Sequence, residues 1–142
     1  MFKKYIYIFA VVVIAISLVS CSDDNSTSPD TSLDTSKLTG NWVVTYYWDD
    51  DKEETYKFTG NSFSFLANGT VSVTVSNSTF PGVWSSGIDD SKAKLYLIFA
   101  SPEHLEEISD DWHVVEQTDT KIRLADESGG DGSTDYLTFE RQ

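Results

Sequence analysis

Few side chains in this sequence have the chemistry of a catalyst or a metal ligand. The chain has two histidines, His104 and His113, and a single cysteine, Cys21. The histidines are nine positions apart, which is not the spacing of a metal-binding pair on one helix, and no second cysteine is present to complete a zinc set. The sequence also lacks a Gly-x-Ser-x-Gly motif, a phosphate loop and a dinucleotide fingerprint. We therefore predict a protein that is not an enzyme, with no catalytic residue and no cofactor.

Carboxylates are the remaining candidate ligands, and they occur in runs. The runs are Asp49–Asp51 with Glu53 and Glu54, then Asp89 and Asp90, then Asp110 and Asp111. Converging carboxylates bind calcium, but the alternating ligands, central glycine and closing glutamate of a calcium loop are absent. We interpret the runs as the solvated rim of the fold and predict no bound metal. Calcium binding by converging acidic loops is the alternative.

Cys21 follows a short apolar segment at the start of the chain. Lys3 and Lys4 precede fifteen almost wholly apolar residues, from Tyr5 to Val19. A membrane-spanning helix needs about 20 such residues, so this run is short for a permanent span. A basic start, an apolar run and small residues at its end are typical of a secretory signal peptide. An unpaired cysteine in an exported protein pairs elsewhere, stays reactive or carries a modification.

The stretch Leu18-Val19-Ser20-Cys21 resembles the lipobox of bacterial lipoproteins. The resemblance implies that residues 1–20 are a signal peptide that is removed, and that Cys21 carries acyl chains such as palmitate. Ser22-Asp23-Asp24 resembles the acidic export signal of surface-exposed lipoproteins in Bacteroidetes-type bacteria. Together these resemblances imply lipid anchoring in the outer membrane with display at the cell surface. An uncleaved N-terminal anchor, a free thiol and an ordinary polar tether are the alternatives.

Composition divides the rest of the chain into a tether and one domain. Residues 22–37 are mostly Ser, Asp, Thr and Asn, with Leu33 as the single large apolar residue. Such a segment cannot bury enough surface to offset its chain entropy. We therefore predict that residues 21–37, from the lipidated cysteine, form a disordered tether with a reach of about 20–25 Å. Residues 38–142 are expected to form a single domain with one modest core.

The charge of the chain limits its partners. The formal net charge is -13, and removal of Lys3 and Lys4 with the signal peptide would make it -15. So acidic a protein repels nucleic-acid phosphates, which excludes nucleic acid as a partner. Solubility of an exposed domain and recognition of a cationic partner both remain as explanations, and no protein partner is indicated.

From Gly40 onward the sequence alternates with a period of two. Phe63 and Phe65 alternate with serines, and the valines of "TVSVTVS" alternate with threonine and serine. Eight such runs predict eight short strands, at residues 42–48, 62–66, 70–76, 82–86, 94–100, 111–117, 120–125 and 135–141. Turn residues separate them, including Asn68-Gly69 and residues 89–92.

These runs predict an all-β fold of about eight antiparallel strands. Closure into an up-and-down β-barrel removes all edge strands, whereas a two-sheet sandwich, the alternative, must protect them. Residues 102–109 are predicted to form one short helix that covers a barrel end, or else a loop, because Ser101, Pro102 and Glu103 are typical of a helix start.

The stretch Leu38-Thr39-Gly40-Asn41-Trp42 resembles the Gly-x-Trp motif at the start of lipocalin and calycin barrels. "FSFLANGTVSV", "GVWSS" and "KLYLIF" resemble the lipocalin-like domains of bacterial exported lipoproteins. The resemblance implies that Gly40, Trp42 and a basic residue of the last strand, here Arg141, form the barrel floor. The chain departs from the family because it is short and lacks both a long helix after the last strand and a disulfide.

A lipocalin-like barrel implies a ligand site inside it. With regular alternation, Trp42, Val44, Tyr46 and Trp48 share one inward face of the first strand. The ligand-binding wall is then predicted to contain Tyr46, Trp48, Phe65, Val73, Leu97 and Trp112. Such a wall suits a small, partly apolar or glycan-like molecule, and predicts a non-enzymatic, membrane-anchored binding module.

A filled core is the alternative to a ligand cavity, because an eight-stranded barrel is near the size that its own side chains fill. The protein would then be a solid barrel or sandwich that acts through its surface as an accessory, adhesion or inhibitor protein. An outward aromatic patch is the expected sign of such a function, with Tyr47, Tyr96 and Trp84 as candidates. A calcium-dependent or hydrolytic enzyme is the third interpretation.

Overall fold

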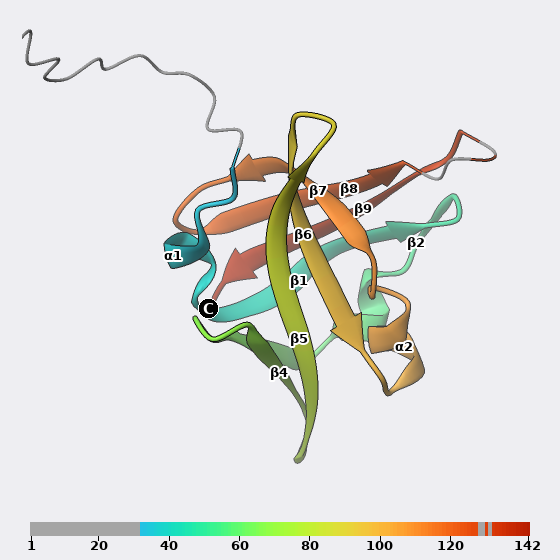
Figure 1. Ribbon diagram of the computed structural model, residues 1–142. Coiled ribbons are helices and arrows are strands. Elements are labelled where there is room, and N and C mark those ends of the chain that lie inside the picture. The colour runs from blue at the N-terminus through green and yellow to red at the C-terminus, as the bar shows by residue number, and fades with distance from the viewer. Residues whose placement is uncertain (1–31, 128–129, 131) are drawn as a thin grey trace, which may run out of the picture.

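The computed structural model describes residues 32–127, 130 and 132–142, which form a closed antiparallel β-barrel (Figure 1). Neighbouring strands follow one another in sequence, and pairing of the first with the last closes the barrel, which confirms the predicted up-and-down fold. The strands are β1 (Gly40–Asp49), β2 (Lys52–Glu53), β3 (Asn61–Phe65), β4 (Thr70–Val75), β5 (Ser78–Asp89), β6 (Lys92–Phe99), β7 (Asp111–Gln117), β8 (Lys121–Glu127) and β9 (Thr134–Arg141). The short β2 pairs antiparallel with the end of β1, and the other eight strands form the barrel.

The signal peptide, Cys21 and the tether up to residue 31 lie outside the described residues. In the part of the chain that the structure does describe, no helix has the length and apolar character needed to cross a membrane.

Alternation and turn chemistry explain most of the strands. In β3 and β4 the residues Phe63, Phe65, Val71 and Val73 are fully buried, while the serines and threonines between them face outward. The predicted turn at residues 89–92 is present: φ is 48° at Asp90 and 63° at Ser91. Two successive left-handed residues are what a two-residue hairpin turn of type I′ requires.

A β-bulge at Thr45 interrupts the alternation of β1. Val44 pairs with Phe139 of β9, and Tyr46 pairs with the next residue, Thr138, so Thr45 is an extra residue. One extra residue reverses which side chains face inward. Tyr47 is therefore buried at 1% exposure and Tyr46 is 39% exposed. The prediction that Tyr46 and Trp48 share the inward face of Trp42 is wrong for this reason.

The folded part begins earlier than predicted. Leu33 is buried in the core, and residues Thr35–Leu38 form a helical turn, α1, although this segment was assigned to the tether. Asp34 caps α1 by accepting from the Ser36 N–H at 3.0 Å. The backbone of Asp34 also makes two 2.9 Å hydrogen bonds with the side-chain amide of Gln117 in β7. These contacts are remote in sequence, so the polar composition of the segment did not reveal them.

Two short helices cover the opposite end of the barrel (Figure 1). They are the 3₁₀-helix η1 (Thr55–Phe58) and the α-helix α2 (Glu103–Glu106), which is the helix predicted from Pro102 and Glu103. Phe58 and Leu105 from these helices are almost fully buried, and so is Ile108 just after α2. The ring of Phe58 packs against His104 with centroids 5.6 Å apart. Helical segments and their apolar side chains therefore cover both ends of the barrel.

Candidate functional site

The barrel interior, where the ligand wall was predicted, is filled with side chains. Aromatic rings pack edge to face there: Phe63 lies 5.2 Å and Phe65 5.7 Å from Phe139, and Phe65 also contacts Trp84 at 6.4 Å. Buried aromatic pairs of this geometry stabilise a core beyond their buried area. The interior is therefore the hydrophobic core.

Four of the six predicted ligand residues belong to this core. They are Phe65, Val73, Leu97 and Trp112, each at most 2% exposed. None of the four lines either of the two surface grooves described below. Trp112 instead donates from its indole nitrogen to the carbonyl of Ile108 at 3.0 Å, which helps to hold the cover at that end of the barrel.

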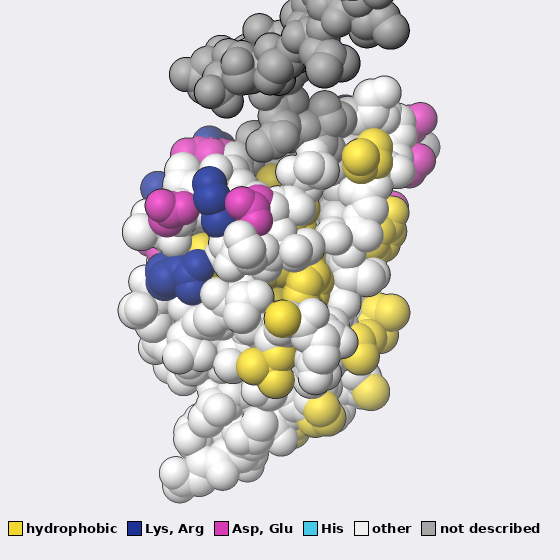
Figure 2. All heavy atoms as spheres, turned by 60° about the vertical axis from the view of Figure 1, so that its left-hand side comes forward, with side chains coloured by type: hydrophobic (Ala, Val, Ile, Leu, Met, Phe, Trp, Pro, Cys, Tyr) yellow, Lys and Arg dark blue, Asp and Glu magenta, His cyan; other side chains and the backbone are white. Residues whose placement is uncertain are grey.

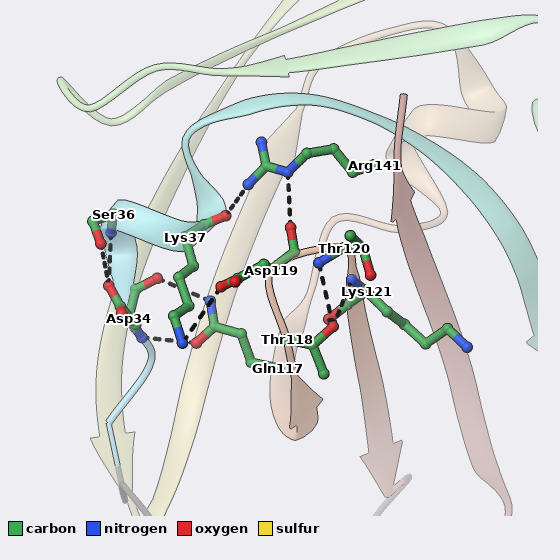
Figure 3. A network of polar contacts seen from close by, with 9 residues as sticks. All are labelled: Asp34, Ser36, Lys37, Gln117, Thr118, Asp119, Thr120, Lys121 and Arg141. Atoms are coloured by element: carbon green, nitrogen blue, oxygen red, sulfur yellow. Dashed lines mark hydrogen bonds and ion pairs between the residues drawn. The ribbon is translucent and has the colours of Figure 1, made fainter.

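Trp42 and Arg141 meet at the floor of the barrel, as neighbours in the pairing of β1 with β9. The guanidinium carbon lies 4.3 Å from the centre of the indole ring. The guanidinium donates to the carbonyl of Thr39 at 3.0 Å. It also donates to the carbonyl of Asp119 at 2.9 Å and to that of Lys37 (Figure 3). One arginine thus joins the end of α1 to the loop between β7 and β8.

Steric constraints explain why the first residue of the Gly-x-Trp motif is glycine. Gly40 has φ of 128°, which side chains rarely adopt, and a Cβ there would lie 2.2 Å from Nη1 of Arg141. The indole nitrogen of Trp42 donates to the carbonyl of Leu38 at 2.7 Å. The three floor residues therefore have structural roles in closing the barrel.

One depression on the described surface of the barrel is lined by aromatic residues, and we call it the outer-face groove. It has a volume of about 400 Å³ and crosses β1, β9, β8 and β7 on the outside of the barrel. We define it by its lining residues, Tyr46, Val115, Arg123, Leu124, Tyr136 and Thr138. Tyr46 and Tyr136 are each 39% exposed, and Val115 is 50% exposed.

Two bulges build the outer-face groove. The bulge at Thr45 turns Tyr46 outward, as described above. In β7 the pairing with β8 shifts between Val114 and Glu116, so Val115 is the extra residue of a second irregularity. Bulges of this kind redirect side chains and are common beside binding sites. The direction of Tyr46 thus depends on a local departure from regular pairing, whereas Val115 is outward already by alternation with Trp112 and Val114.

The groove combines flat apolar surface with a few polar groups. Trp48, the neighbour of Tyr136 in the β1–β9 pairing, extends the aromatic surface beyond the groove. Arg123 lies in the groove with its guanidinium 3.3 Å from the Glu116 carboxylate, and both side chains are about half exposed. An exposed ion pair of this kind is weak, so Arg123 is able to exchange its partner for a ligand. The chemistry is that of a binding surface.

Sequence reasoning placed Tyr46 and Trp48 among the ligand residues but on the wrong side of the barrel wall. It missed Val115, Arg123 and Tyr136. A signal for Tyr136 exists, because it is out of phase with the inward Leu137 and Phe139 of the same strand. A signal for Val115 exists as well, because regular alternation from the inward Trp112 and Val114 places it outward.

The aromatic patch predicted for a surface function is also composed differently. Tyr47 and Trp84 are buried at 1% and 8% exposure, so they belong to the core. Tyr96 is half-buried against Gly87, since a Cβ added to Gly87 would lie 3.2 Å from the Tyr96 ring. The aromatic residues that gather on the outer surface are instead Tyr46, Tyr136 and, in part, Trp48, while the exposed Tyr56 lies apart from them in η1.

A second groove, of about 410 Å³, lies where β6 and β7 separate and α1 approaches them. Its lining includes Asp34, Lys37, Lys92 and Glu116. Lys37 and Lys92 make exposed ion pairs, at 3.6 Å with Asp119 and at 3.7 Å with Glu127. No lining residue of this groove is aromatic, so it lacks the flat apolar faces of the outer-face groove.

Two carboxylate trios lie within reach of a shared ion among the described residues. They are Asp49, Glu54 and Glu107, and Asp110, Asp111 and Asp126. A lysine accompanies each trio. Lys57 pairs with Glu107 and Glu54, whose hydrogen bonds raise its pKa, and Lys94 lies 3.5 Å from Asp111. Burial, with the nearby carboxylates of Asp110 and Asp111, raises the pKa of Asp126.

The two histidines lie outside both grooves. Burial lowers the pKa of His104 and of His113. The amide of the buried Asn61 donates to Nε2 of His104 at 2.9 Å, which requires that nitrogen to be unprotonated. His104 therefore has a packing role beside η1.

Comparison with known proteins adds little to this description. No family model matches the chain, and no curated protein matches it. Among solved structures the chain is similar to a DUF4847 family protein from Bacteroides vulgatus, with 18% identity and a TM-score of 0.49. The alignment covers 73% of this chain and 93% of that one. At this level the likeness carries no argument, so the site is interpreted from its own geometry.

Proposed function

We propose that this protein is a non-enzymatic binding module that binds its ligand in the outer-face groove, outside the barrel. The observation that carries this proposal is the contrast between a filled interior and an open aromatic groove. Phe63, Phe65 and Phe139 occupy the barrel centre, whereas Tyr46 and Tyr136 are exposed in the groove. Exposed aromatic side chains that gather in a depression with a few polar groups are typical of binding sites.

The ligand class follows from the groove lining. The rings of Tyr46 and Tyr136 offer flat apolar faces, and their hydroxyl groups, with that of Thr138, offer hydrogen bonds. Arg123 adds a positive charge in a protein whose net charge is -13. A small, partly apolar molecule with hydroxyl or anionic groups, such as a glycan-like compound, matches this combination.

A protein partner is the second candidate for the groove, and the position of the groove favours it. The groove lies on the outer surface, and it combines tyrosine and arginine, the residue types enriched at interface hot spots. An accessory, adhesion or inhibitor protein would use such a surface in the same place.

Outer-membrane anchoring through Cys21 completes the proposal. Its support is the sequence of residues 1–24, where a basic start, an apolar run and a lipobox-like stretch precede the cysteine. Several acyl chains would hold the protein stably, whereas one chain binds a bilayer only marginally. In a Cys21→Ser variant, we expect the protein to leave the membrane fraction and to lose the added acyl mass. An unchanged mass and an unchanged membrane fraction would contradict the anchor.

Ligand-observed NMR with a panel of neutral and anionic oligosaccharides and small aromatic compounds tests the groove. A compound that binds the full chain is expected to bind Tyr136→Ala at least roughly tenfold more weakly, because it loses one aromatic face and its hydrogen bond. Tyr56→Ala is the matched control, since Tyr56 is an exposed tyrosine outside the groove. Equal loss in both variants, or no loss in Tyr136→Ala and Tyr46→Ala, would refute this site.

A further inference from the structure

Most basic side chains on the described surface lie next to carboxylates of the same protein. Arg123 lies 3.3 Å from Glu116, and Lys121 lies 3.3 Å from Glu140. Figure 2 shows this arrangement on one face, where Lys and Arg side chains share one region with Asp and Glu side chains. An anionic ligand that binds one of these basic groups therefore replaces a carboxylate of the protein itself.

Strand pairing places one of these ion pairs in a row with two residues of the outer-face groove. Thr138 of β9 pairs with Tyr46 of β1 on one side and with Arg123 of β8 on the other. Arg123 in turn pairs with Glu116 of β7. Directly opposite residues have Cβ atoms about 4.5–5.5 Å apart. The four side chains therefore form a continuous row across the outside of the barrel, from an aromatic ring to a charged pair.

The two bulges put the ends of this row in place. With regular pairing, Thr45 and not Tyr46 would lie opposite Thr138. In β7 the extra residue Val115 likewise gives the position opposite the arginine to Glu116. Bulges are frequent beside functional sites, where they redirect a side chain. Both ends of the row thus result from the same kind of local irregularity.

The contact between Arg123 and Glu116 leaves most of the guanidinium available. One terminal nitrogen, Nη1, donates to Oε2 of Glu116 at 3.3 Å, and the guanidinium makes no other hydrogen bond with the described residues. Both side chains are about half exposed. An exposed ion pair contributes little to stability, whereas two parallel N–H donors to one carboxylate form a strong and directional contact. A ligand carboxylate that binds both terminal nitrogens therefore forms the better pair.

We infer, on the basis of the proposed function, that the outer-face groove selects a sugar that carries a carboxylate, and that Glu116 occupies the place of this carboxylate in the free protein. Neighbouring strands are about 4.8 Å apart, so the backbones of Tyr46 and Arg123, two strands apart, are separated by roughly 10 Å. A sugar ring packed on Tyr46 lies over Thr138 and extends its carboxylate to Arg123. The replaced Glu116 side chain stays exposed to solvent at the edge of the groove.

The other groups of the groove favour a sugar over other anions. The hydroxyls of Tyr46 and Tyr136 make no hydrogen bond with the described residues, so they are available to the hydroxyls of a sugar. An aromatic acid would leave them unused. A phosphate ester carries a charge of about -2 near neutral pH. One arginine beside Glu116, in a protein of net charge -13, does not offset that charge.

Ligand-observed NMR with pairs of methyl glycosides tests this selection. Each pair, in the gluco, galacto or manno series, consists of a uronic acid and the neutral sugar that has a hydroxymethyl group in place of its carboxylate. At least one uronic acid is expected to bind the full chain about tenfold more tightly than its neutral partner, because only the acid forms charged hydrogen bonds with Arg123.

Two variants should change this preference in opposite directions. Arg123→Gln removes the guanidinium, so the ratio of the two affinities should fall to about one. Glu116→Gln removes the competing carboxylate, so the uronic acid should bind about two- to fivefold more tightly than it binds the wild type. Lys121→Gln is the matched control, because Lys121 is an exposed basic residue of the same strand, paired with Glu140 and outside the groove. Its ratio should stay at the wild-type value.

Equal affinity for acid and neutral sugars overturns the inference, and so does an equal fall of the ratio in Arg123→Gln and Lys121→Gln. A Glu116→Gln variant that binds the uronic acid no more tightly than the wild type also overturns it. Uronic acids that fail to bind, while another compound depends on Tyr136, overturn the inference but leave the groove as the binding site. Uronic acids whose binding depends on neither Tyr136 nor Tyr46 refute the groove itself, and the inference with it.

Discussion

At the scale of single residues, Arg141 organises the floor of the barrel. Its planar guanidinium lies over the Trp42 ring and donates to carbonyls from two separate segments of the chain. Lysine has one compact ammonium group and cannot reproduce this fork of donors. The requirement for glycine at position 40 follows from the same guanidinium, which occupies the space of a side chain there.

We predict that Arg141→Lys lowers the free energy of unfolding by about 2–3 kcal/mol, through loss of hydrogen bonds and of the stacked guanidinium. Urea denaturation followed by tryptophan fluorescence measures this loss. Arg123→Lys is the control, because Arg123 makes an exposed ion pair with Glu116, and its loss should stay below about 1 kcal/mol. Equal midpoints for wild type and Arg141→Lys would contradict the role of the guanidinium.

A second prediction at this scale concerns pH and His104. Burial lowers its pKa below the ordinary value of 6.5, so the folded protein binds a proton less readily than the unfolded chain. The stability that neutral His104 contributes is therefore fully present above about pH 6.5, and it is lost as the pH falls below that value. The difference in unfolding free energy between wild type and His104→Gln should shrink between pH 7.5 and pH 5.5. A constant difference would show that protonation of His104 is not opposed by the fold.

At the scale of elements, turns and bulges decide where side chains point. The β5–β6 hairpin turns at Asp90 and Ser91, both in the left-handed region without a glycine. A residue with a Cβ is disfavoured there by roughly 1–2 kcal/mol, a penalty that glycine avoids. The hairpin forms nevertheless, because eight residue pairs along β5 and β6 hold its two strands.

We therefore expect Ser91→Gly to stabilise the protein by about 0.5–1 kcal/mol, after subtraction of the greater freedom of glycine in the unfolded chain. Thermal and urea unfolding of the variant measure the gain. Ser86→Gly is the matched control: Ser86 is an exposed serine within β5, and glycine in a strand should destabilise by about 0.5–1 kcal/mol. A loss of stability in Ser91→Gly would show that the turn does not carry this strain.

At the scale of the whole molecule, the protein is a solid barrel that presents different surfaces on its outside. Helical segments between or before the strands cover both ends, with Leu38 at the floor and Leu105 at the other end. The aromatic residues are consequently divided between a buried cluster and the outer-face groove. Charge is unevenly distributed as well, because residues 59–88, with β3, β4 and nearly all of β5, contain no Lys, Arg, Asp or Glu.

If the barrel is filled, truncation of an inner aromatic residue should lower the free energy of unfolding much more than truncation of an outer one. Phe65→Ala should lower the free energy of unfolding by about 3–5 kcal/mol, since Phe65 is fully buried among other rings. Tyr136→Ala, which truncates a ring that is 39% exposed, should cost much less. Urea denaturation of the two variants side by side gives the comparison. A Phe65→Ala variant as stable as Tyr136→Ala would show that the interior is loosely packed and has room for a ligand.

Sequence patterns were sufficient to predict the barrel and the residues of its floor. Period-two alternation marks the eight barrel strands because one face of each is buried, and turn residues such as Asn68-Gly69 mark their ends. The Gly-x-Trp motif and the arginine of the last strand lie at opposite ends of the domain sequence. They meet because an up-and-down barrel places its last strand beside its first.

Which side chains lie inside and which lie outside after each bulge follows from strand pairing in the folded barrel. One extra residue, Thr45 or Val115, reverses the facing of the residues that follow, and nothing local in the sequence marks it. The buried Leu33 and the pairing of Asp34 with Gln117 likewise depend on contacts across the whole fold. The candidate site shifted from the barrel interior to its outer face for this reason: side-chain identity follows from sequence, but side-chain direction depends on strand register.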